Sequence, residues 1–402
     1  MSNKKYNILL VHNFYQKPGG EDTVFYNEKK LLEDNGHKVV TYTRDNKELK
    51  EYSFLKKILL PIIIIFNFKI YLDIKKIIKD NNIDIVHVHN TLSLISPSVF
   101  YAAVKMKKPV VQTLHNFRMQ CPSALFYRDG HICEDCVNDG LMCAIKHKCY
   151  RNSFIQTLAI VIMTKIHRLT GIYKKVNFIC LTEFNKNKLL LINKKKEIVD
   201  SNKIFVKPNF VFDENDNDKK LEDISKKENN GYYLYVGRLD EIKGIDTVLL
   251  AFSKMPDREL HVIGSGGEEY IKEYSRYANI KFLGQLSHDN VMREMREGTA
   301  LVFASKWYEG MPMAIIESFE QCLPVISCNL GNANELVVDR ITGLHFEMGS
   351  VSSLINIIDK FEVVLFDKTM RFNARNEYMR KYNHFVGYDN IKAIYEEIFN
   401  AK

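Results

Sequence analysis

The sequence lacks an apolar run long enough to cross a membrane. In its most apolar region, residues 53–78, the longest uncharged stretch is Ile58–Phe68, which spans 11 residues and contains Pro61, whereas a membrane-spanning helix needs about 20. The apolar stretch that precedes His12 is too short for a secretory signal. We therefore expect the chain to stay in the cytoplasm, where its eight cysteines would be reduced rather than paired.

Several other signatures are also missing. No internal repeat of the solenoid or propeller kind is present. The glycines of HVIGSGGEE lack the full dinucleotide-binding fingerprint and its downstream acid, which disfavours a dehydrogenase. An acid–x–acid motif occurs at Asp216–Asp218, but it lies in a strongly polar stretch, so we expect it to be solvated.

The charge is divided unevenly along the 402 residues. Residues 1–208 carry 34 Lys and Arg against 18 Asp and Glu, while residues 209–402 carry 23 against 31. A basic half indicates an anionic partner such as a membrane surface or a nucleic acid, unless its lysines are spread over solvated faces.

Short apolar runs alternate with helical patterns along both halves, which is typical of parallel sheets wound with helices on both faces. We predict an α/β fold with Rossmann-like, doubly wound domains at 1–208 and 231–384, joined by a polar linker at 209–230. Strands are expected at residues 7–12, 39–42, 83–89, 109–114, 176–181, 204–207, 232–237, 259–263, 280–283, 300–305 and 325–328.

The stretch Ala300–Cys328 reads as strand, loop, helix and strand. This arrangement places the loop and the helix N-terminus at the carboxyl edge of a parallel sheet, where open α/β folds bind ligands. Glu309 in the loop and Glu317 in the helix could hold the hydroxyls of a sugar nucleotide. By spacing alone, two solvated acids are the simpler interpretation.

Other polar residues follow predicted strands. Arg238 and Lys243 lie in one loop before a helix, which makes a ready site for a diphosphate. The turn at Gly19 and Gly20 would let the backbone approach a ligand. His115 directly follows a strand and could position a substrate group, or it could simply cap a turn.

A cysteine cluster occupies residues 121–149. The CxxC pair Cys133 and Cys136 suits two ligands of a tetrahedral zinc site, which Cys121 and Cys149 could complete. Cys143, His131 and His147 are competing ligands, and reduced structural thiols are the alternative. A redox CxxC is disfavoured because it does not open a helix after a strand.

The region 53–78 combines apolar residues with lysines. It fits helices that lie on an anionic bilayer surface, or equally helices that cover the sheet and turn some lysines outward. The charge asymmetry favours membrane contact.

Motifs in both halves resemble a known family. GRLDEIKG, GSGGEE, FLGQLSHDNV, YEGMPMAIIESFEQCLPVI and GNANELVVDRITGL resemble the C-terminal domain of retaining glycosyltransferase family 4, which has the GT-B fold. PGGEDTVFYNE resembles the family's glycine-rich acceptor-side loop. DIVHVHNTLSLISPSVFYAA, QTLHNFRMQCPSALFYRDGHICEDC and LTEFNKNKLL resemble a bacterial subset that makes surface polysaccharides. The resemblance runs in order along nearly the whole chain.

The resemblance implies two domains that face each other across a cleft, with residues 385–402 crossing back to the first. It implies that Arg238 and Lys243 neutralise the leaving diphosphate, that Glu317 binds the ribose, and that Glu309 and His115 contact the sugar. The residues implied to hold the sugar and phosphates through their backbone are Gly19, Gly20, Gly310, Met311, Pro312 and Met313. It also implies catalysis without a divalent metal.

We therefore expect a retaining glycosyltransferase that moves a sugar from a nucleotide sugar to a glycan or polyprenyl-diphosphate-linked acceptor at the inner membrane face. A nucleotide-sugar epimerase of the same fold is the nearest alternative. Such an enzyme would differ from a transferase by turning over the donor without an acceptor. A non-catalytic basic module that binds membrane or nucleic acid is a third; the paired glutamates and phosphate-site cations disfavour it.

Overall fold

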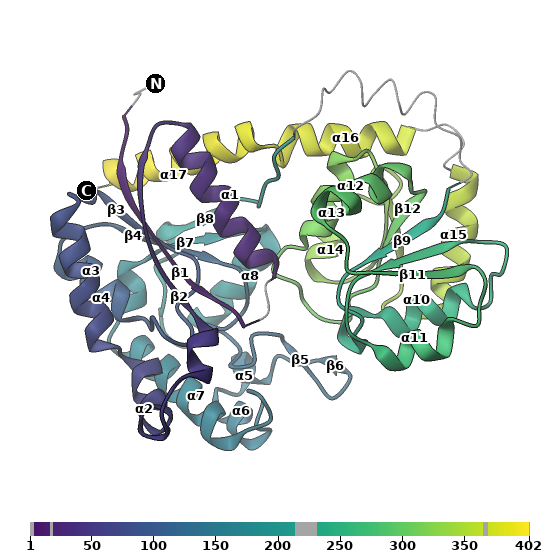
Figure 1. Cartoon of the computed structure of the whole chain (residues 1–402). Helices are drawn as coiled ribbons and strands as arrows, with labels where there is room; N and C mark the ends of the chain where they lie inside the picture. Colours follow the sequence, from purple (N-terminus) through teal and green to yellow (C-terminus); the bar gives the residue numbers. More distant parts are fainter. Residues whose placement is uncertain (1–3, 17–18, 214–230, 365–368, 402) are drawn as a thin grey trace. The chain divides into compact units, whose positions relative to one another are not determined.

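The computed structural model describes residues 4–16, 19–213, 231–364 and 369–401. Most of the predicted linker, including Asp216–Asp218, lies outside these ranges. The chain divides into two compact units: residues 1–128, 133–209 and 387–402 form the first, and residues 129–132 and 210–386 form the second. Each unit contains one six-stranded sheet (Figure 1).

The first sheet is parallel throughout, with the strand order β2-β1-β3-β4-β7-β8. Its strands are β1 (Asn7–Phe14), β2 (Lys38–Asp45), β3 (Ile85–Val88), β4 (Val110–Leu114), β7 (Asn177–Cys180) and β8 (Ile204–Val206). A separate two-stranded ribbon joins β5 (Tyr127–Arg128) to β6 (His131–Ile132).

Helices pack on both faces of this sheet. The helices of the first unit are α1 (Gly20–Asp34), α2 (Phe54–Ile65), α3 (Phe68–Asp80), α4 (Ser98–Lys105), α5 (Asp135–Asn138), α6 (Met142–Lys146), α7 (Phe154–Leu169) and α8 (Glu183–Leu190). Side chains alternate between the two faces of a strand: Leu9 and Val11 pack in the core that α3 and α4 cover. Ile8 and Leu10 pack in the opposite core, which α1 and the C-terminal helix α17 (His384–Asn400) cover.

The second sheet is also parallel, with the order β11-β10-β9-β12-β13-β14. Its strands are β9 (Tyr233–Val236), β10 (Leu260–Ile263), β11 (Ile280–Gly284), β12 (Ala300–Phe303), β13 (Val325–Cys328) and β14 (Gly343–Phe346). Its helices are α10 (Ile245–Phe252), α11 (Glu268–Tyr274), α12 (His288–Glu297), α13 (Met313–Glu320), α14 (Gly331–Leu336), α15 (Val351–Val364) and α16 (Thr369–Lys381). The two parallel sheets confirm the predicted α/β fold class.

Region 53–78 forms two helices, α2 and α3. Helix α2 continues through Pro61, although proline lacks the N–H that would bond the preceding turn. Leu60 and Ile64 pack beside Ile160 and Met163 of α7, and this packing holds the helix together around the missing bond. No helix among the described residues is long and apolar enough to cross a membrane.

Candidate active site

The second sheet reverses its strand order between β9 and β12, which are neighbours although two strands separate them in sequence. In open α/β sheets the ligand crevice lies at such a reversal, outside the carboxyl ends of the strands. Arg238 and a short helical turn, Glu241–Lys243, follow β9, and the loop 304–312 follows β12. Both predicted phosphate-site cations and Glu309 therefore come from the two strands that border the reversal.

Glycine brings these two loops into contact. Gly244 caps α10 with a φ of 74°, and a Cβ there would lie 2.0 Å from the carbonyl oxygen of Ala304. The backbone N–H of Lys306 also donates to the carbonyl of Ile242 at 2.9 Å. A residue with a side chain at position 244 would push Lys243 away from the end of β12.

Glu309 is the centre of a hydrogen-bond cluster. Its Oε1 accepts from Lys243 Nζ at 2.6 Å, from Ser305 Oγ at 2.7 Å and from Trp307 Nε1 at 3.0 Å. The Lys243 ammonium also lies 5.4 Å from the centre of the Trp307 ring, a favourable cation–π distance. Asn332 Nδ2 donates to the carbonyls of Glu309 and Gly310 at 2.5 and 2.6 Å. The carboxylate and its backbone are therefore both held in place.

Glu317 lies on the less buried side of α13. Pro312 is the N-cap residue of this helix, and Met313 is the first residue within it. Ile315, Ile316 and Phe319 are buried beneath. Burial raises the pKa of the Glu317 carboxyl. The nearby His288 lowers this pKa by a smaller amount, and the charge of Glu320 raises it further. A ligand hydroxyl that donates to Glu317 would find a strong acceptor in a poorly hydrated place.

Arg238 differs from Lys243 in its surroundings. Its side chain is exposed, and its nearest carboxylate is that of Asp240, 3.3 Å away. Such an exposed pair contributes little to stability. Arg238 can therefore exchange Asp240 for an anionic ligand, whereas Lys243 is already oriented by Glu309.

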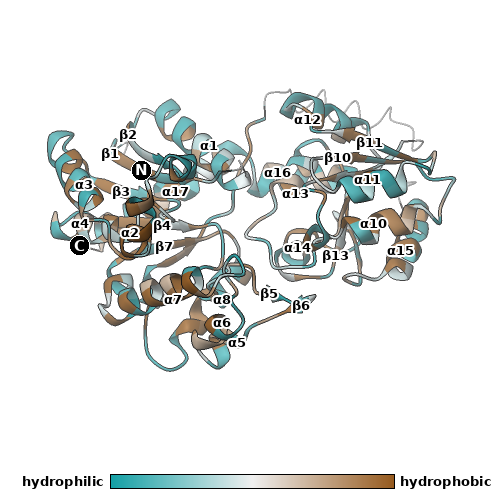
Figure 2. Ribbon diagram, turned by 60° about the horizontal axis from the view of Figure 1, so that its bottom comes forward, coloured by the Kyte–Doolittle hydropathy of each residue, from teal (hydrophilic) through white to brown (hydrophobic). Residues whose placement is uncertain are grey.

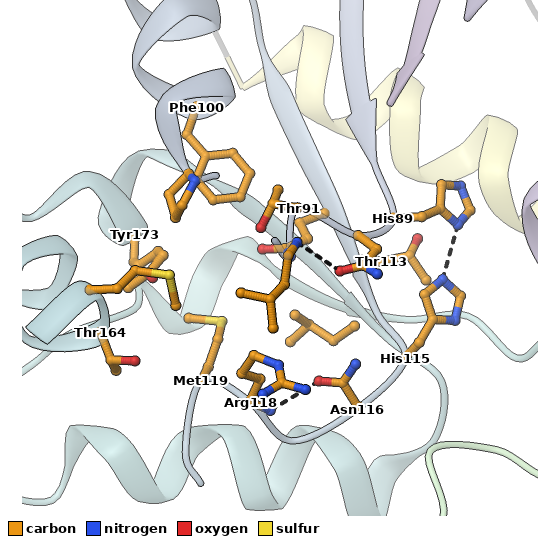
Figure 3. A pocket seen from close by; sticks show the side chains of 16 residues that line it. His89, Thr91, Phe100, Thr113, His115, Asn116, Arg118, Met119, Thr164 and Tyr173 are labelled. Atoms are coloured by element: carbon orange, nitrogen blue, oxygen red, sulfur yellow. Dashed lines mark hydrogen bonds between the residues drawn. The ribbon is translucent and has the colours of Figure 1, made fainter. Parts of the chain in front are cut away.

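The predicted residues of the first unit lie at the carboxyl ends of β1 and β4. Gly19 caps α1 and Gly20 begins it; a Cβ at Gly19 would meet no atom within 4 Å. His115 Nε2 lies 3.0 Å from Nδ1 of His89, and both line a cavity of about 60 Å³ together with Asn116 and Arg118 (Figure 3). Burial and the adjacent His89 hold the pKa of His115 well below its usual range, so this imidazole is neutral.

Glu21 also belongs to this site, although it was not among the predicted site residues. Burial, and then the adjacent Asp22, raise the pKa of the Glu21 carboxyl to about 8, while hydrogen bonds to Tyr15 and Asn116 and the charge of Arg118 lower it by less. Glu21 is therefore largely protonated at neutral pH. Its place directly after Gly19 and Gly20 was the available signal.

Among the described residues no cysteine is paired in a disulfide. Cys136 packs in a small core with Cys143 and Cys149 beside it. Burial, and then the nearby thiols of Cys121 and Cys149, raise the pKa of Cys136 to about 12. Among the described residues, one group of potential metal ligands has its ligand atoms close enough together to share an ion. This group consists of Glu28, His87 and His89 and contains no cysteine.

The predicted site residues thus form one group in each unit. The second unit brings Lys243 together with Glu309 on one carboxyl edge, with Arg238, Gly310–Met313 and Glu317 on the adjoining segments. The first unit places Gly19, Gly20 and His115 at the corresponding edge of its own sheet. Ser305, Trp307 and Asn332, which orient Glu309, were not predicted.

Family models match both units. The model described as Glycosyltransferase Family 4 matches residues 18–130, and the one described as Glycosyl transferases group 1 matches residues 216–375. An uncharacterised 42.6 kDa protein in the cps region of Klebsiella pneumoniae is 24% identical over 77% of this chain and 76% of its own length. A UDP-Gal:alpha-D-GlcNAc-diphosphoundecaprenol alpha-1,3-galactosyltransferase of Escherichia coli is 28% identical over 54% of this chain and 59% of its own length.

Solved structures share the fold along the whole chain. A glycosyltransferase from Rickettsia africae superposes with a TM-score of 0.67 at 21% identity, over 99% of this chain and 100% of that one. Anabaena Alr3699/HepE in complex with UDP superposes with a TM-score of 0.65 at 16% identity, over 97% and 100%. The sheets, the site at the strand reversal and the family matches together define a glycosyltransferase with the GT-B fold. More particularly, the chain belongs to glycosyltransferase family 4.

Proposed function

We propose that this glycosyltransferase moves a sugar from a nucleotide-sugar donor to a hydroxyl of a glycan or lipid-linked saccharide during the synthesis of a bacterial surface polysaccharide. The observation that carries the proposal is the Lys243–Glu309 pair at the strand reversal of the second sheet. The relative named as an alpha-D-GlcNAc-diphosphoundecaprenol galactosyltransferase supports a lipid-linked class of acceptor. The UDP complex of a structural neighbour supports a nucleotide sugar as the donor.

The chemistry requires stabilisation of charge on the leaving group. Cleavage of the anomeric C–O bond leaves negative charge on the nucleotide diphosphate, and a cation fixed before the reaction stabilises that charge most effectively. Glu309, Ser305 and Trp307 form the cluster that fixes the Lys243 ammonium, while exposed Arg238 supplies a second cation. In this proposal Glu309 also contacts the donor sugar.

The remaining roles concern the two ends of the donor. Glu317 binds the ribose hydroxyls, and the backbone of Gly310–Met313 and of Gly19 and Gly20 holds the sugar and phosphates. His115 contacts the reacting sugar. We propose that transfer retains the anomeric configuration and uses no divalent metal, with the acceptor hydroxyl entering from the face that the diphosphate leaves.

An exposed apolar face in the first unit favours contact with an anionic bilayer. Helices α2 and α7 are rich in apolar residues (Figure 2). Along one side of α2, the apolar side chains are exposed. These exposed side chains are Phe54, Leu55, Ile58, Leu59 and Ile62, each at least 50% accessible. Exposed lysines on α2, α3 and α7 are Lys56, Lys57, Lys69, Lys76, Lys79 and Lys165. Such a combination is typical of helices that lie in the plane of an anionic membrane surface. We propose that this face holds the enzyme at the inner membrane, where a polyprenyl-linked acceptor resides.

The cysteine cluster gives rise to a separate proposal, a structural zinc ion held by Cys121, Cys133, Cys136 and Cys149. Its support is the spacing of the CxxC pair and the proximity of the thiols: Cys121 and Cys149 help to raise the pKa of Cys136, and Cys121 and Cys133 help to raise the pKa of Cys149. Thiolates bound to zinc would lose their protons despite that elevation.

Calorimetric titration tests the donor site. UDP, GDP and ADP, each with and without an attached hexose, are titrated into the wild type, Glu317→Ala and Glu273→Ala, the last a control with an exposed acid in α11. We expect one base to bind selectively, with affinity lost in Glu317→Ala and kept in the control. Equal binding by Glu317→Ala would reject the ribose role. Turnover of the donor sugar without any acceptor would instead indicate an epimerase.

A further inference from the structure

A charged cluster lies fully buried in the first unit, on the face of the sheet that α1 and α17 cover. It consists of Glu28 from α1, His87 and His89 from the end of β3, and Lys207 just after β8. The proposed function uses none of these four side chains. Buried charges cost several kcal/mol each unless they are paired, so their presence calls for an explanation.

A chain of close contacts between side chains connects this cluster to His115. Lys207 Nζ donates to Glu28 Oε2 at 3.0 Å. The other carboxylate oxygen, Oε1, lies 3.3 Å from His89 Nε2, and His89 Nδ1 lies 3.0 Å from His115 Nε2. Figure 3 shows the last of these contacts at the edge of the cavity.

His87 closes the cluster on its other side. Its Nδ1 lies 3.0 Å from Glu28 Oε1 and 2.7 Å from the hydroxyl of Tyr395 in α17, and its Nε2 lies 2.8 Å from Thr113 Oγ1. The cluster is therefore held by residues from α1, α17 and three strands or strand ends. Its geometry is set by the core of the unit and not by a surface loop.

The charge balance favours hydrogen bonding over metal binding. Burial alone would raise the pKa of Glu28, but the Lys207 ammonium and then His87 outweigh it and hold that pKa well below its usual range. Glu28 and Lys207 thus form a neutral pair. A divalent cation between Glu28, His87 and His89 would add two positive charges to a buried cluster that is already balanced, beside an ammonium group.

The protonation pattern follows from the donors and acceptors. Glu28 Oε1 and His89 Nε2 face each other at 3.3 Å without full hydrogen-bond geometry, and neither atom has another hydrogen-bond partner among the described residues. An ionised carboxylate only accepts, so the Glu28 charge favours the tautomer of His89 that carries its proton on Nε2. Burial lowers the pKa of His89 to about 4, so the ring is neutral and its Nδ1 is an acceptor. His115 Nε2 must then donate to it, which leaves Nδ1 of His115 with a free lone pair.

We propose that Glu28 and Lys207 are positioning residues that fix His115 as the Nε2–H tautomer, so that its Nδ1 accepts a hydrogen bond from a hydroxyl of the reacting sugar. This role rests on the proposed contact between His115 and the sugar. The arrangement resembles the way in which a carboxylate orients a histidine elsewhere in enzymes, by holding one ring nitrogen so that the other presents the correct state.

The test measures the tautomer directly and so does not depend on activity. The full-length protein is labelled with ¹⁵N-histidine, and long-range proton–nitrogen spectra assign the protonated nitrogen of His115, with His115→Gln identifying its signals. We expect the Nε2–H tautomer in the wild type. In Glu28→Gln/Lys207→Met, which removes both buried charges together, we expect a mixture of tautomers. The control is Glu33→Gln/Lys29→Met, which removes an exposed pair from the same helix and should leave the spectrum unchanged.

Kinetics supply the second measurement. Once a donor and acceptor are known, the double variant should lose roughly 10- to 100-fold in kcat, with the donor KM within about twofold. An Nδ1–H tautomer in the wild type, or a folded double variant with an unchanged tautomer and kcat, would overturn the proposal. So would one equivalent of bound metal that Glu28→Gln loses and Cys136→Ser retains. Loss of the predicted tautomer in a protein that transfers sugar would reject this inference alone.

Discussion

Glu21 provides a quantitative test of the site in the first unit. Its pKa of about 8 in the folded chain stands against an ordinary value of 4.5. A carboxyl that binds its proton more tightly when folded destabilises the folded state as the pH rises from the unfolded to the folded pKa. The wild type should therefore lose stability through Glu21 between about pH 4.5 and pH 8, and Glu21→Gln should not.

The full shift corresponds to roughly 5 kcal/mol, at about 1.4 kcal/mol per pKa unit. Two features reduce this value. Glu21 lies in the first turn of α1, where the helix dipole favours a carboxylate by about 0.5–1 kcal/mol, and its side chain is only partly shielded from solvent. We therefore expect Glu21→Gln to be more stable than the wild type by about 2–3 kcal/mol at pH 8, and by almost nothing at pH 5.

Thermal unfolding across pH 5 to 9 measures this difference. For a unit of this size, 1 kcal/mol shifts Tm by about 2–4 °C, so a gain of about 2–3 kcal/mol should raise the transition of the first unit by roughly 4–12 °C at pH 8. The control is Glu33→Gln on the same helix, where an exposed pair with Lys29 contributes little. A difference between Glu21→Gln and the wild type that stays constant with pH, or a variant less stable at pH 8, would refute the assignment of a raised pKa.

Three further predictions concern the other proposals. Arg238→Ala with Lys243→Ala should lower turnover by orders of magnitude because, in the proposed function, both cations neutralise the leaving diphosphate; a near-normal kcat would remove that role. Metal analysis of the purified protein should find about one zinc ion per chain, lost in Cys136→Ser, and a metal-free wild type would end the zinc proposal. Ile58→Asp with Ile62→Asp should weaken binding to vesicles that contain anionic lipid by about tenfold or more, since each apolar side chain contributes about 1.5–3 kcal/mol when buried. Unchanged vesicle binding would contradict the membrane face.

Local patterns predicted much of this fold. The alternation of short apolar runs with helical stretches led to both sheets, and the stretch Ala300–Cys328 forms the predicted strand, loop, helix and strand. Lys243 and Glu309 could be placed on the same sheet edge because each lies in the loop that follows a strand. These features depend on neighbours within a few residues along the chain, which a sequence displays.

Long-range partners could not be predicted in the same way. Glu28 and Lys207 are 179 positions apart, and in the sequence each resembles an ordinary surface charge of a helix or a loop. Trp307 and Ser305 stand within four residues of Glu309, yet which side-chain atoms point toward its carboxylate depends on rotamers that packing selects. Tyr395 contacts His87 only because α17 returns to the first unit.

The return of α17 has a consequence for synthesis on the ribosome. Ile391, Ile394, Tyr395 and Ile398 complete the core that also contains Phe25, so the first unit is assembled from residues at both ends of the sequence. At about 5–20 residues per second, translation of the second unit keeps that core open for tens of seconds. The nascent first unit must therefore wait with part of its apolar surface uncovered, and the second unit, whose residues are nearly contiguous, is able to finish folding before it.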